Sequence, residues 1–456
     1  MIGKWCLSQL QETLEGVLHG DDVEFNGVSI DTRTIVPGNV FLALKGPNFD
    51  GHRFVAQALE KGAVAAIVSE LQPGDISQLQ VEDTHAALGL LGKQNRQRSE
   101  AQIVAVTGSA GKTTVKEMLA AILRTQGNTL ATRGNLNNDI GAPLTLMELE
   151  DDHQFGVIEL GASAEKEIEY TVGLTLPRVS ILTNAMGAHL EGFGSLQGVV
   201  RAKGEIFDVL PADGVAVINA DDPHAPIWLA RAEQTRRITF GVENVYADVN
   251  ATRLEVGANG CYQFYLMHQE HAVEVELRVL GRHNVANAAA AAAAIVALGL
   301  PLEVAAQGLA QFLPVKGRMY PHTLDQGVHV IDDTYNANPG SVKAAIDMLA
   351  TLPGKQLLVL GDMAELGETA AEQHADIGDY AAQKGTDRLL AVGALSSQAV
   401  ETFNTARDIS GGAYASKEEL IAALQDFLEP GMTVLVKGSR SAGMEQVVAG
   451  LVEGNH

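Results

Sequence analysis

A glycine-rich segment that carries a lysine and several hydroxyl groups offers the most specific chemistry in this sequence. Residues 107–114 read TGSAGKTT, between an apolar run, IVAV, and a helical pattern, VKEMLAAIL. Such a loop presents backbone N–H groups and a helix N-terminus to phosphate oxygens. We expect the Lys112 ammonium to reach the β- and γ-phosphates and the Thr113 hydroxyl to hold Mg²⁺. The other loop residues expected at the phosphates are Thr107, Gly108, Ser109, Ala110, Gly111 and Thr114.

This loop predicts a nucleoside triphosphate without predicting the reaction, because several classes of nucleotide-binding protein share it. The usual pattern has glycine where this chain has Val106, and a guanine-reading N-K-x-D segment is absent. The alternative interpretation is a glycine turn that happens to precede a lysine. Strand, loop and helix follow one another in the required order, which favours the phosphate-binding interpretation.

Three blocks of alternating strand and helix patterns position this loop, and they predict an α/β fold with three domains. Residues 1–98 predict a small α/β substrate domain, with strand-like stretches around a Pro37–Gly38 turn. Residues 99–314 combine the phosphate loop with apolar strands and helices, which predicts a mainly parallel sheet. Within that block, the stretch from Asp248 to Leu280 lacks helices and predicts an antiparallel edge sheet. Residues 315–456 repeat strand, loop and helix four times, which favours a Rossmann-like domain, although the G-x-G-x-x-G fingerprint is missing.

Composition excludes several other classes of protein. The 456 residues include 56 acidic and 32 basic side chains, and the net charge of −24 argues against a nucleic-acid partner. Anionic ligands must therefore be bound by local helix N-termini, basic residues and Mg²⁺. The negative charge elsewhere on the protein has little effect there, because charge is screened beyond ~8 Å. Two isolated cysteines and an N-terminus without an apolar signal core favour a cytoplasmic protein. The run VANAAAAAAAIVALGL is interpreted as a packed helix and not as a membrane span.

The order of further motifs along the whole chain resembles the Mur ligase family. The phosphate loop is preceded by SIDTRTIVPGNVFLALKG and DGHRF, and it is followed by GNLNNDIGAPLTL, ELGAS, AHLEGFGS, AKGEIF, GRHNVANAAAA, KGRM, DDTYNANPGS, LGDMAELG and VLVKGSRSAGME. This family's loop also lacks the glycine at the place of Val106. The resemblance implies an ATP-dependent, ADP-forming amide ligase of peptidoglycan precursor synthesis. In such a reaction, the γ-phosphoryl group passes to a carboxylate, and an amine then displaces phosphate from the acyl phosphate.

The same resemblance implies the substrates. GNLNNDIG, HLEGFGS and DDTYNANPGS favour the family members that join D-alanyl-D-alanine to UDP-N-acetylmuramoyl-tripeptide. One alternative is a sister ligase that adds a single amino acid, and an alternative from another class is a P-loop regulatory ATPase. We expect a monomer without stable membrane insertion, whose domains close over the substrates.

Two Mg²⁺ sites follow from the resemblance. Thr113 and Glu159, which ends the strand pattern FGVIE, would hold one ion, and His189 in AHLEG would hold the second. Lys203 in AKGEIF matches a lysine that is carbamylated in related ligases, which turns a cation into an anionic oxygen ligand. By residue type alone, Glu159 would be a solvated strand end, His189 a structural hydrogen-bonding residue and Lys203 a solvated helix residue.

Further residues around the nucleotide and the substrates are implied in the same way. At the nucleotide they are Asn284 and Asn287 with neighbouring His283 at the adenine, Arg318 at the γ-phosphate, and Asp333 or its neighbour Asp332 at the ribose. Without the resemblance, the two asparagines would be a helix cap and a polar helix face. The UDP moiety is expected to meet Ser29, Arg33, Lys45, Gly46, Asp50, Gly51 and His52. The muramoyl substrate and the dipeptide are expected to meet Asn137, Asn138, Lys437, Ser439 and Arg440. The residues expected to take part in catalysis are Lys112, Glu159, His189, Lys203 and Arg318.

Overall fold

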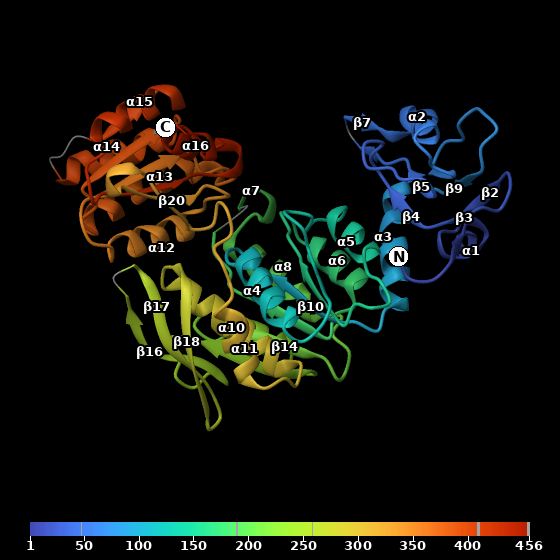
Figure 1. The fold of residues 1–456 in the computed structure, drawn as a ribbon, viewed down its shortest axis with the longest axis horizontal. Coiled ribbons are helices and arrows are strands. Elements are labelled where there is room, and N and C mark those ends of the chain that lie inside the picture. The colour runs from blue at the N-terminus through green and yellow to red at the C-terminus, as the bar shows by residue number, and fades with distance from the viewer. Residues whose placement is uncertain (47, 188–189, 258, 408–410, 454–456) are drawn as a thin grey trace.

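Three large sheets organise the chain. The computed structural model describes residues 1–46, 48–187, 190–257, 259–407 and 411–453. The N-terminal block, in blue, and the C-terminal block, in orange and red, lie on opposite sides of the central block (Figure 1). The three-domain α/β fold expected from the sequence is confirmed. The division of the chain after residues 98 and 314 stays a prediction.

The N-terminal block is built on a five-stranded sheet. In spatial order, its strands are β2 (Val17–His19), β9 (Gln78–Gln80), β8 (Ala65–Val68), β5 (Asn39–Leu42) and β4 (Gly27–Ser29). Smaller elements surround it: β1 (Trp5–Cys6) with β3 (Glu24–Phe25), β6 (Lys45–Gly46) with β7 (Phe49–Asp50), α1 (Leu7–Thr13) and α2 (Val55–Glu60). Helix α3 (Thr84–Arg98) begins after Asp83, whose carboxylate accepts the His85 N–H at 2.7 Å.

The central block holds a nine-stranded sheet that contains the phosphate loop. Its spatial order is β11 (Thr129–Ala131), β12 (Phe155–Glu159), β10 (Gln102–Thr107), β13 (Val179–Leu182), β14 (Val215–Asn219), β15 (Arg236–Gly241), β16 (Val249–Val256), β17 (Cys261–His268) and β18 (His271–Leu280). The strands are parallel from β11 to β16, and β17 and β18 continue antiparallel. The antiparallel edge predicted for this stretch is therefore confirmed.

Helices cover both faces of the central sheet. One face packs against α4 (Lys112–Arg124), α10 (His283–Ala297) and α11 (Leu302–Leu309). The other packs against α5 (Gly141–Met147), α6 (Glu167–Thr175), α7 (Leu190–Phe193), α8 (Leu196–Gly204) and α9 (Ala225–Arg231). The alanines of α10 are buried, because small side chains let this helix approach the sheet closely. Among the described residues, no helix is long and apolar enough to cross a membrane.

The C-terminal block holds a six-stranded sheet of Rossmann-like form. Its spatial order is β19 (Tyr320–Thr323), β20 (His329–Asp333), β24 (Thr433–Lys437), β21 (Gln356–Gly361), β22 (Arg388–Val392) and β23 (Gly412–Tyr414). All neighbours are parallel except β19, which is antiparallel to β20. The flanking helices are α12 (Pro339–Leu349), α13 (Ala370–Gln383), α14 (Ser396–Arg407), α15 (Lys417–Phe427) and α16 (Glu445–Glu453). The four predicted strand–helix units are present, and β19 and β23 are additional.

Candidate active site

The phosphate loop lies between the end of β10 and the start of α4, where the sequence predicts it. Thr107 ends the strand, and its hydroxyl donates to the Leu160 carbonyl oxygen at 2.7 Å. Gly108 and Gly111 have φ values of 150° and 81°. A Cβ atom at Gly108 would lie 1.9 Å from Thr183 Oγ1, and one at Gly111 would lie 2.5 Å from an Asn287 side-chain oxygen. Both the backbone conformation and the space therefore require glycine.

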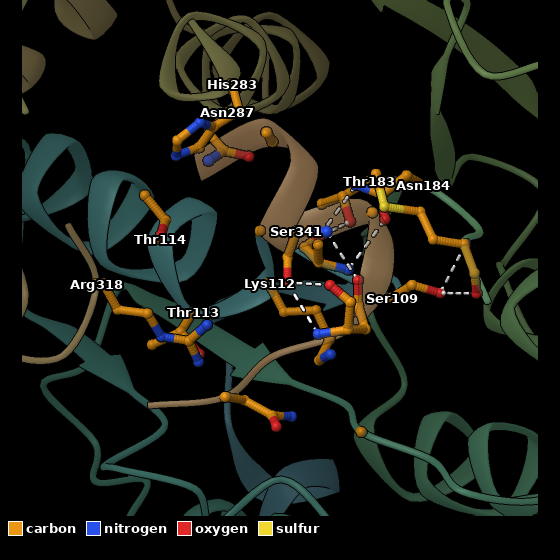
Figure 2. Close-up of a pocket in the computed structure, with 18 of the residues that line it drawn as sticks. Ser109, Lys112, Thr113, Thr114, Thr183, Asn184, His283, Asn287, Arg318 and Ser341 are labelled. Atoms are coloured by element: carbon orange, nitrogen blue, oxygen red, sulfur yellow. Dashed lines mark hydrogen bonds between the residues drawn. The ribbon is translucent and has the colours of Figure 1, made fainter. Parts of the chain in front are cut away.

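The segment after β13 fixes the loop, and the sequence analysis missed it. The Ala110 N–H donates to Asn184 Oδ1 at 2.9 Å, and the Ser109 N–H donates to the Asn184 carbonyl oxygen at 3.0 Å. Thr183 Oγ1 donates to the Ala110 carbonyl oxygen at 2.6 Å. Figure 2 shows Thr183 and Asn184 beside Ser109. The sequence feature that indicates this role is the polar pair Thr183 and Asn184 directly after the buried strand VSIL. Neighbouring parallel strands end at the same sheet edge, so this pair is expected beside the phosphate loop.

Lys112 and Glu159 bring opposite charges to the loop. Lys112 Nζ donates to the Gly108 carbonyl oxygen at 2.7 Å. Burial lowers the pKa of Lys112, the Glu159 carboxylate opposes that shift, and the Arg318 charge adds to it. Glu159 ends β12, and its side chain is buried; Oε1 accepts Asn137 Nδ2 at 2.8 Å.

The other Glu159 oxygen, Oε2, is buried without a hydrogen-bond partner in the described part of the chain. A buried carboxylate oxygen without a partner is costly, and a cation at this place would remove that cost. Carboxylate and hydroxyl oxygens are suitable ligands for Mg²⁺. Glu159 and Thr113 therefore fit the first predicted metal site. The described residues contain no group of three or more His, Cys, Asp or Glu that would form a metal site by itself.

Arg318 connects the C-terminal block to the phosphate loop. Its Nη2 donates to Thr113 Oγ1 at 3.0 Å, and its guanidinium carbon lies 3.9 Å from the centre of the Tyr335 ring. Arg318 Nε is buried and finds no acceptor among the residues that the structure describes. Arg318 and Thr113 lie together on one side of Lys112 (Figure 2). Two cations thus approach the loop from different domains.

Lys203 is a buried lysine near the same site. It lies on α8 with 2% of its surface exposed, and Nζ donates to the Ala162 carbonyl oxygen at 3.2 Å. Burial, together with the nearby Lys112 charge, lowers the pKa of Lys203 to about 7 against the pull of two glutamates. Lys203 is thus not the solvated helix residue that its type alone would suggest. His189, predicted beside it, lies outside the described residues.

The residues predicted at the nucleoside lie at the start of α10 and the end of β20. Asn284 Nδ2 donates to the Leu280 carbonyl oxygen at 2.7 Å, and Asn287 Nδ2 donates to Asn284 Oδ1 at 2.8 Å. Burial lowers the pKa of neighbouring His283, which favours the neutral imidazole. Asp333 accepts the Met319 N–H at 3.3 Å and faces the cavity, whereas Asp332 accepts the Thr334 hydroxyl at 2.6 Å.

The residues predicted for the dipeptide have different environments. Lys437 is buried and forms an ion pair with Asp333, Nζ to Oδ2, at 2.5 Å. Ser439 is buried, and its hydroxyl donates to the Asp362 carbonyl oxygen at 2.6 Å. Arg440 lines the cavity with its side chain 66% exposed, and its ion pair with Glu445 measures 3.1 Å. Only Arg440 of these three thus presents an exposed charge to the cavity.

One cavity of about 670 Å³ joins most of these groups, a size typical of ligand pockets. Predicted residues in its wall include Ser109, Ala110, Gly111, Lys112, Thr113, Thr114, Asn137, Asn138, Glu159, Asn284, Asn287, Arg318, Asp333 and Lys437. Asn138 also accepts the Gly141 N–H at 2.9 Å at the start of α5. The cavity therefore lies between the central and C-terminal sheets.

The residues predicted for the UDP moiety lie in the N-terminal block, away from this cavity. Ser29 donates to the Asp31 carbonyl oxygen at 2.9 Å, and Arg33 pairs with the Asp31 carboxylate. In the hairpin of β6 and β7, Gly46 lies opposite Phe49, and Lys45 pairs with Glu70 at 2.7 Å.

His52 is buried in the same block. Its Nδ1 lies 2.7 Å from Asp50 Oδ1, and its Nε2 accepts the Ser69 N–H at 3.0 Å. Both ring nitrogens are therefore used within the protein. The assignment of these N-terminal residues to the UDP moiety stays a prediction.

Family models match all three blocks of this chain. The matches are "Mur ligase family, catalytic domain" over residues 24–124, "Mur ligase middle domain" over 106–295 and "Mur ligase, glutamate ligase domain" over 317–440. A UDP-N-acetylmuramoyl-tripeptide–D-alanyl-D-alanine ligase from Escherichia coli strain K12 is 45% identical over 449 residues, 98% of each chain. The chain belongs to the Mur ligase family. A similar ligase from Haemophilus influenzae is 40% identical over 97% of each chain.

Solved Mur ligases share the fold of this one. A crystal structure of MurF from Acinetobacter baumannii superposes with a TM-score of 0.93 at 38% identity and covers 99% of both chains. MurF ligase from Thermotoga maritima in complex with ADP superposes with a TM-score of 0.84 at 27% identity, over 94% of this chain and 97% of that one.

Proposed function

We propose that this Mur ligase joins D-alanyl-D-alanine to UDP-N-acetylmuramoyl-tripeptide, with ATP converted to ADP and phosphate, in peptidoglycan precursor synthesis. The 45% identity with the Escherichia coli enzyme of that name, over nearly the whole of both chains, carries this proposal. The cavity supports it, because a phosphate loop and a second sheet edge face one another there. We infer that the chain acts in this pathway as a cytoplasmic monomer.

The first step joins the tripeptide's terminal carboxylate to the γ-phosphoryl group. A carboxylate oxygen forms a bond to the γ-phosphorus, and the bond to the β–γ bridging oxygen breaks, which releases ADP. Lys112 and Arg318 approach this place from two domains and stabilise the charge that concentrates there. Bound Mg²⁺ supplies further charge neutralisation, and Thr113 and Glu159 would hold one such ion.

The second step forms the amide. The dipeptide's amine attacks the carbonyl carbon of the acyl phosphate, the phosphate leaves, and the nitrogen gives up a proton. We place the dipeptide's carboxylate at Arg440, because its side chain is largely exposed at the cavity, whereas Lys437 and Ser439 are buried and bonded inside the protein. A terminal carboxylate at a fixed distance from the reacting amine separates a dipeptide from a single amino acid.

Carbamylated Lys203 completes the proposed second metal site, together with His189. The neutral amine of Lys203 attacks carbon dioxide, forms an N–C bond and loses a proton, which yields a carbamate. The hydrogen bond from Nζ to the carbonyl oxygen of Ala162 supports this, because Ala162 is a residue of the cavity wall. The buried position also protects a carbamate from exchange with solvent.

Phosphate release by purified protein tests the proposed function. With Mg-ATP and UDP-muramoyl tripeptide present, phosphate should appear when D-alanyl-D-alanine is added and far less with free D-alanine, glutamate or diaminopimelate. Preferred use of a single amino acid with a shorter acceptor would identify a sister ligase. ATP hydrolysis at a rate that is independent of both substrates would instead identify a regulatory ATPase.

A further inference from the structure

A second lysine of the phosphate-loop helix is entirely buried and has no part in the steps described above. Lys116 lies one turn after Lys112 on α4, with a side chain that is 0% exposed. Its Nζ donates to the Thr132 carbonyl oxygen at 2.7 Å and to Glu117 Oε1 at 2.5 Å. Buried ion pairs add little net stability, because desolvation offsets the attraction between the charges. Stability alone therefore gives little reason for a charge here.

The partner of Lys116 connects it to the predicted metal ligand. Thr132 directly follows β11, and its N–H donates to the Val157 carbonyl oxygen of β12 at 3.0 Å. Its hydroxyl accepts the Glu159 N–H at 2.9 Å in a buried position. Lys116 holds the carbonyl group of Thr132, and the Thr132 side chain holds the backbone of Glu159.

The same residue begins the loop that supports the Glu159 side chain. Beyond Thr132, the chain runs to Asn137, whose amide donates to Glu159 Oε1 at 2.8 Å. Backbone and side chain of Glu159 are thus both fixed by the segment that Lys116 anchors. Because Lys116 and Thr113 belong to one helix, this anchor sets the separation between Thr113 Oγ1 and the Glu159 carboxylate.

We propose that Lys116 is a positioning residue that fixes Glu159 relative to Thr113, through Thr132, for binding of the divalent cation. This inference rests on the proposed function only in that Glu159 and Thr113 hold the cation. Metal ligands must stay within about 0.5 Å of their productive geometry. Loss of residues that orient a ligand reduces metal affinity by about ten- to a hundredfold.

Manganese binding provides a test that does not depend on turnover. Mn²⁺ is titrated into the full-length protein saturated with ADP and followed by electron paramagnetic resonance. Lys116→Met keeps the length and volume of the side chain but loses the hydrogen bond to Thr132. We expect its Mn²⁺ dissociation constant to rise about ten- to a hundredfold, and the Mg²⁺ concentration for half-maximal phosphate release to rise in parallel.

The counter-ion gives a matched control. Glu117→Gln removes the negative partner of Lys116 but leaves the bond from Nζ to Thr132. Glu117 is 31% exposed, so water and counter-ions can replace its charge. Its Mn²⁺ affinity should stay within about twofold of wild type, a change well below the ten- to hundredfold loss expected for Lys116→Met. Equal losses in the Lys116 and Glu117 variants would overturn the proposal and indicate an effect of buried charge alone.

A second pair of variants tests the linkage if Lys116→Met does not fold. Thr132→Val removes the hydroxyl that accepts the Glu159 N–H, whereas Thr132→Ser retains it. Mn²⁺ affinity should fall in the valine variant and recover in the serine variant. Unchanged Mn²⁺ affinity in folded Lys116→Met, or in Thr132→Val, would show that the segment is merely structural. Wild-type Mn²⁺ binding without amide formation from the proposed substrates would contradict the proposed function and leave this inference standing.

Discussion

Replacement of Arg318 by methionine separates a catalytic contribution from a structural one. The change loses the hydrogen bond from the charged guanidinium to Thr113, worth about 1.5–3 kcal/mol, and the stacking on Tyr335, worth ~0.5–2 kcal/mol. It also removes a buried N–H without an acceptor in the described chain, which costs about 1–3 kcal/mol when left unpaired. These terms partly cancel and leave a loss of about 1.5 kcal/mol, so the melting temperature should fall by no more than about 6 °C.

Activity should respond very differently to the same change. Loss of one preorganised contact to the charge that develops during transfer reduces kcat by about 10²–10³-fold, or ~2.7–4 kcal/mol. Phosphate release at saturating ATP, tripeptide and dipeptide measures this loss, and scanning calorimetry measures stability. Arg318→Lys should be intermediate, since it keeps the charge but not the planar fork of donors.

Arg388 provides a matched control, because it stacks on Phe427 at 4.0 Å in the same domain without lining the cavity. Arg388→Met should lose a similar stacking energy and keep its turnover. If Arg318→Met retained kcat within about threefold of wild type, where the contact argument requires a far larger loss, the proposed role at the γ-phosphate would be wrong. If both variants lost activity and stability together, the effect would be one of folding.

Four further predictions follow from the site. Glu159→Gln keeps an oxygen for Asn137 but loses its charge, so kcat should fall at least a hundredfold at any Mg²⁺ concentration while calorimetry shows an intact fold. As the pH rises, kcat/KM for ATP should fall along an alkaline limb when Lys112 loses its proton, and this limb should lie at lower pH than the ordinary lysine pKa of 10.5, because burial lowers the pKa of Lys112. The limb should move to still lower pH in Glu159→Gln, which removes the opposing negative charge, and to higher pH in Arg318→Met, which removes a neighbouring positive charge. Lys203→Ala should be nearly inactive and partly rescued by short carboxylic acids, and full unaided activity would exclude a role as carbamate. Small-angle scattering should record a smaller radius of gyration with ADP and muramoyl substrate than without them, as the N-terminal block approaches the cavity.

The sequence predicts most of the fold because its long elements carry strong patterns. The phosphate loop, the parallel strands and the alanine-rich helix are all found where apolar periodicity and glycine placement predict them. The sequence does not predict the short strands β11, β19 and β23, because these three segments have three or four residues and carry too little apolar periodicity. β11 is nevertheless important, since Thr132 follows it directly and bonds to Glu159.

Pairings between distant residues could not be read from the chain. The sequence predicts separate roles for Asp333, at the ribose, and for Lys437, at the dipeptide. In the structure these two residues, 104 positions apart in the chain, lie opposite each other in β20 and β24. That neighbourhood depends on strand order, because β24 is inserted between β20 and β21. Asn137 was predicted near the phosphate or the muramoyl substrate, and the structure adds a bond to Glu159 that no local pattern encodes.

The arrangement of sheet edges explains why no single motif indicates the reaction. The carboxyl ends of β10, β12 and β13 are neighbours, and they bring the phosphate loop, Glu159 and Thr183 to one edge of the central sheet. The carboxyl ends of β20 and β24 bring Asp333 and Lys437 to one edge of the C-terminal sheet. Ligands of open α/β sheets bind at such edges, and here two edges line the same cavity. One edge holds a triphosphate as any P-loop protein does, so the choice of acceptor and amine must come from the facing edge and the N-terminal block. In the proposed mechanism, a phosphorylated carboxylate forms where the second domain can deliver an amine before water reaches it, which would make domain contact part of the chemistry.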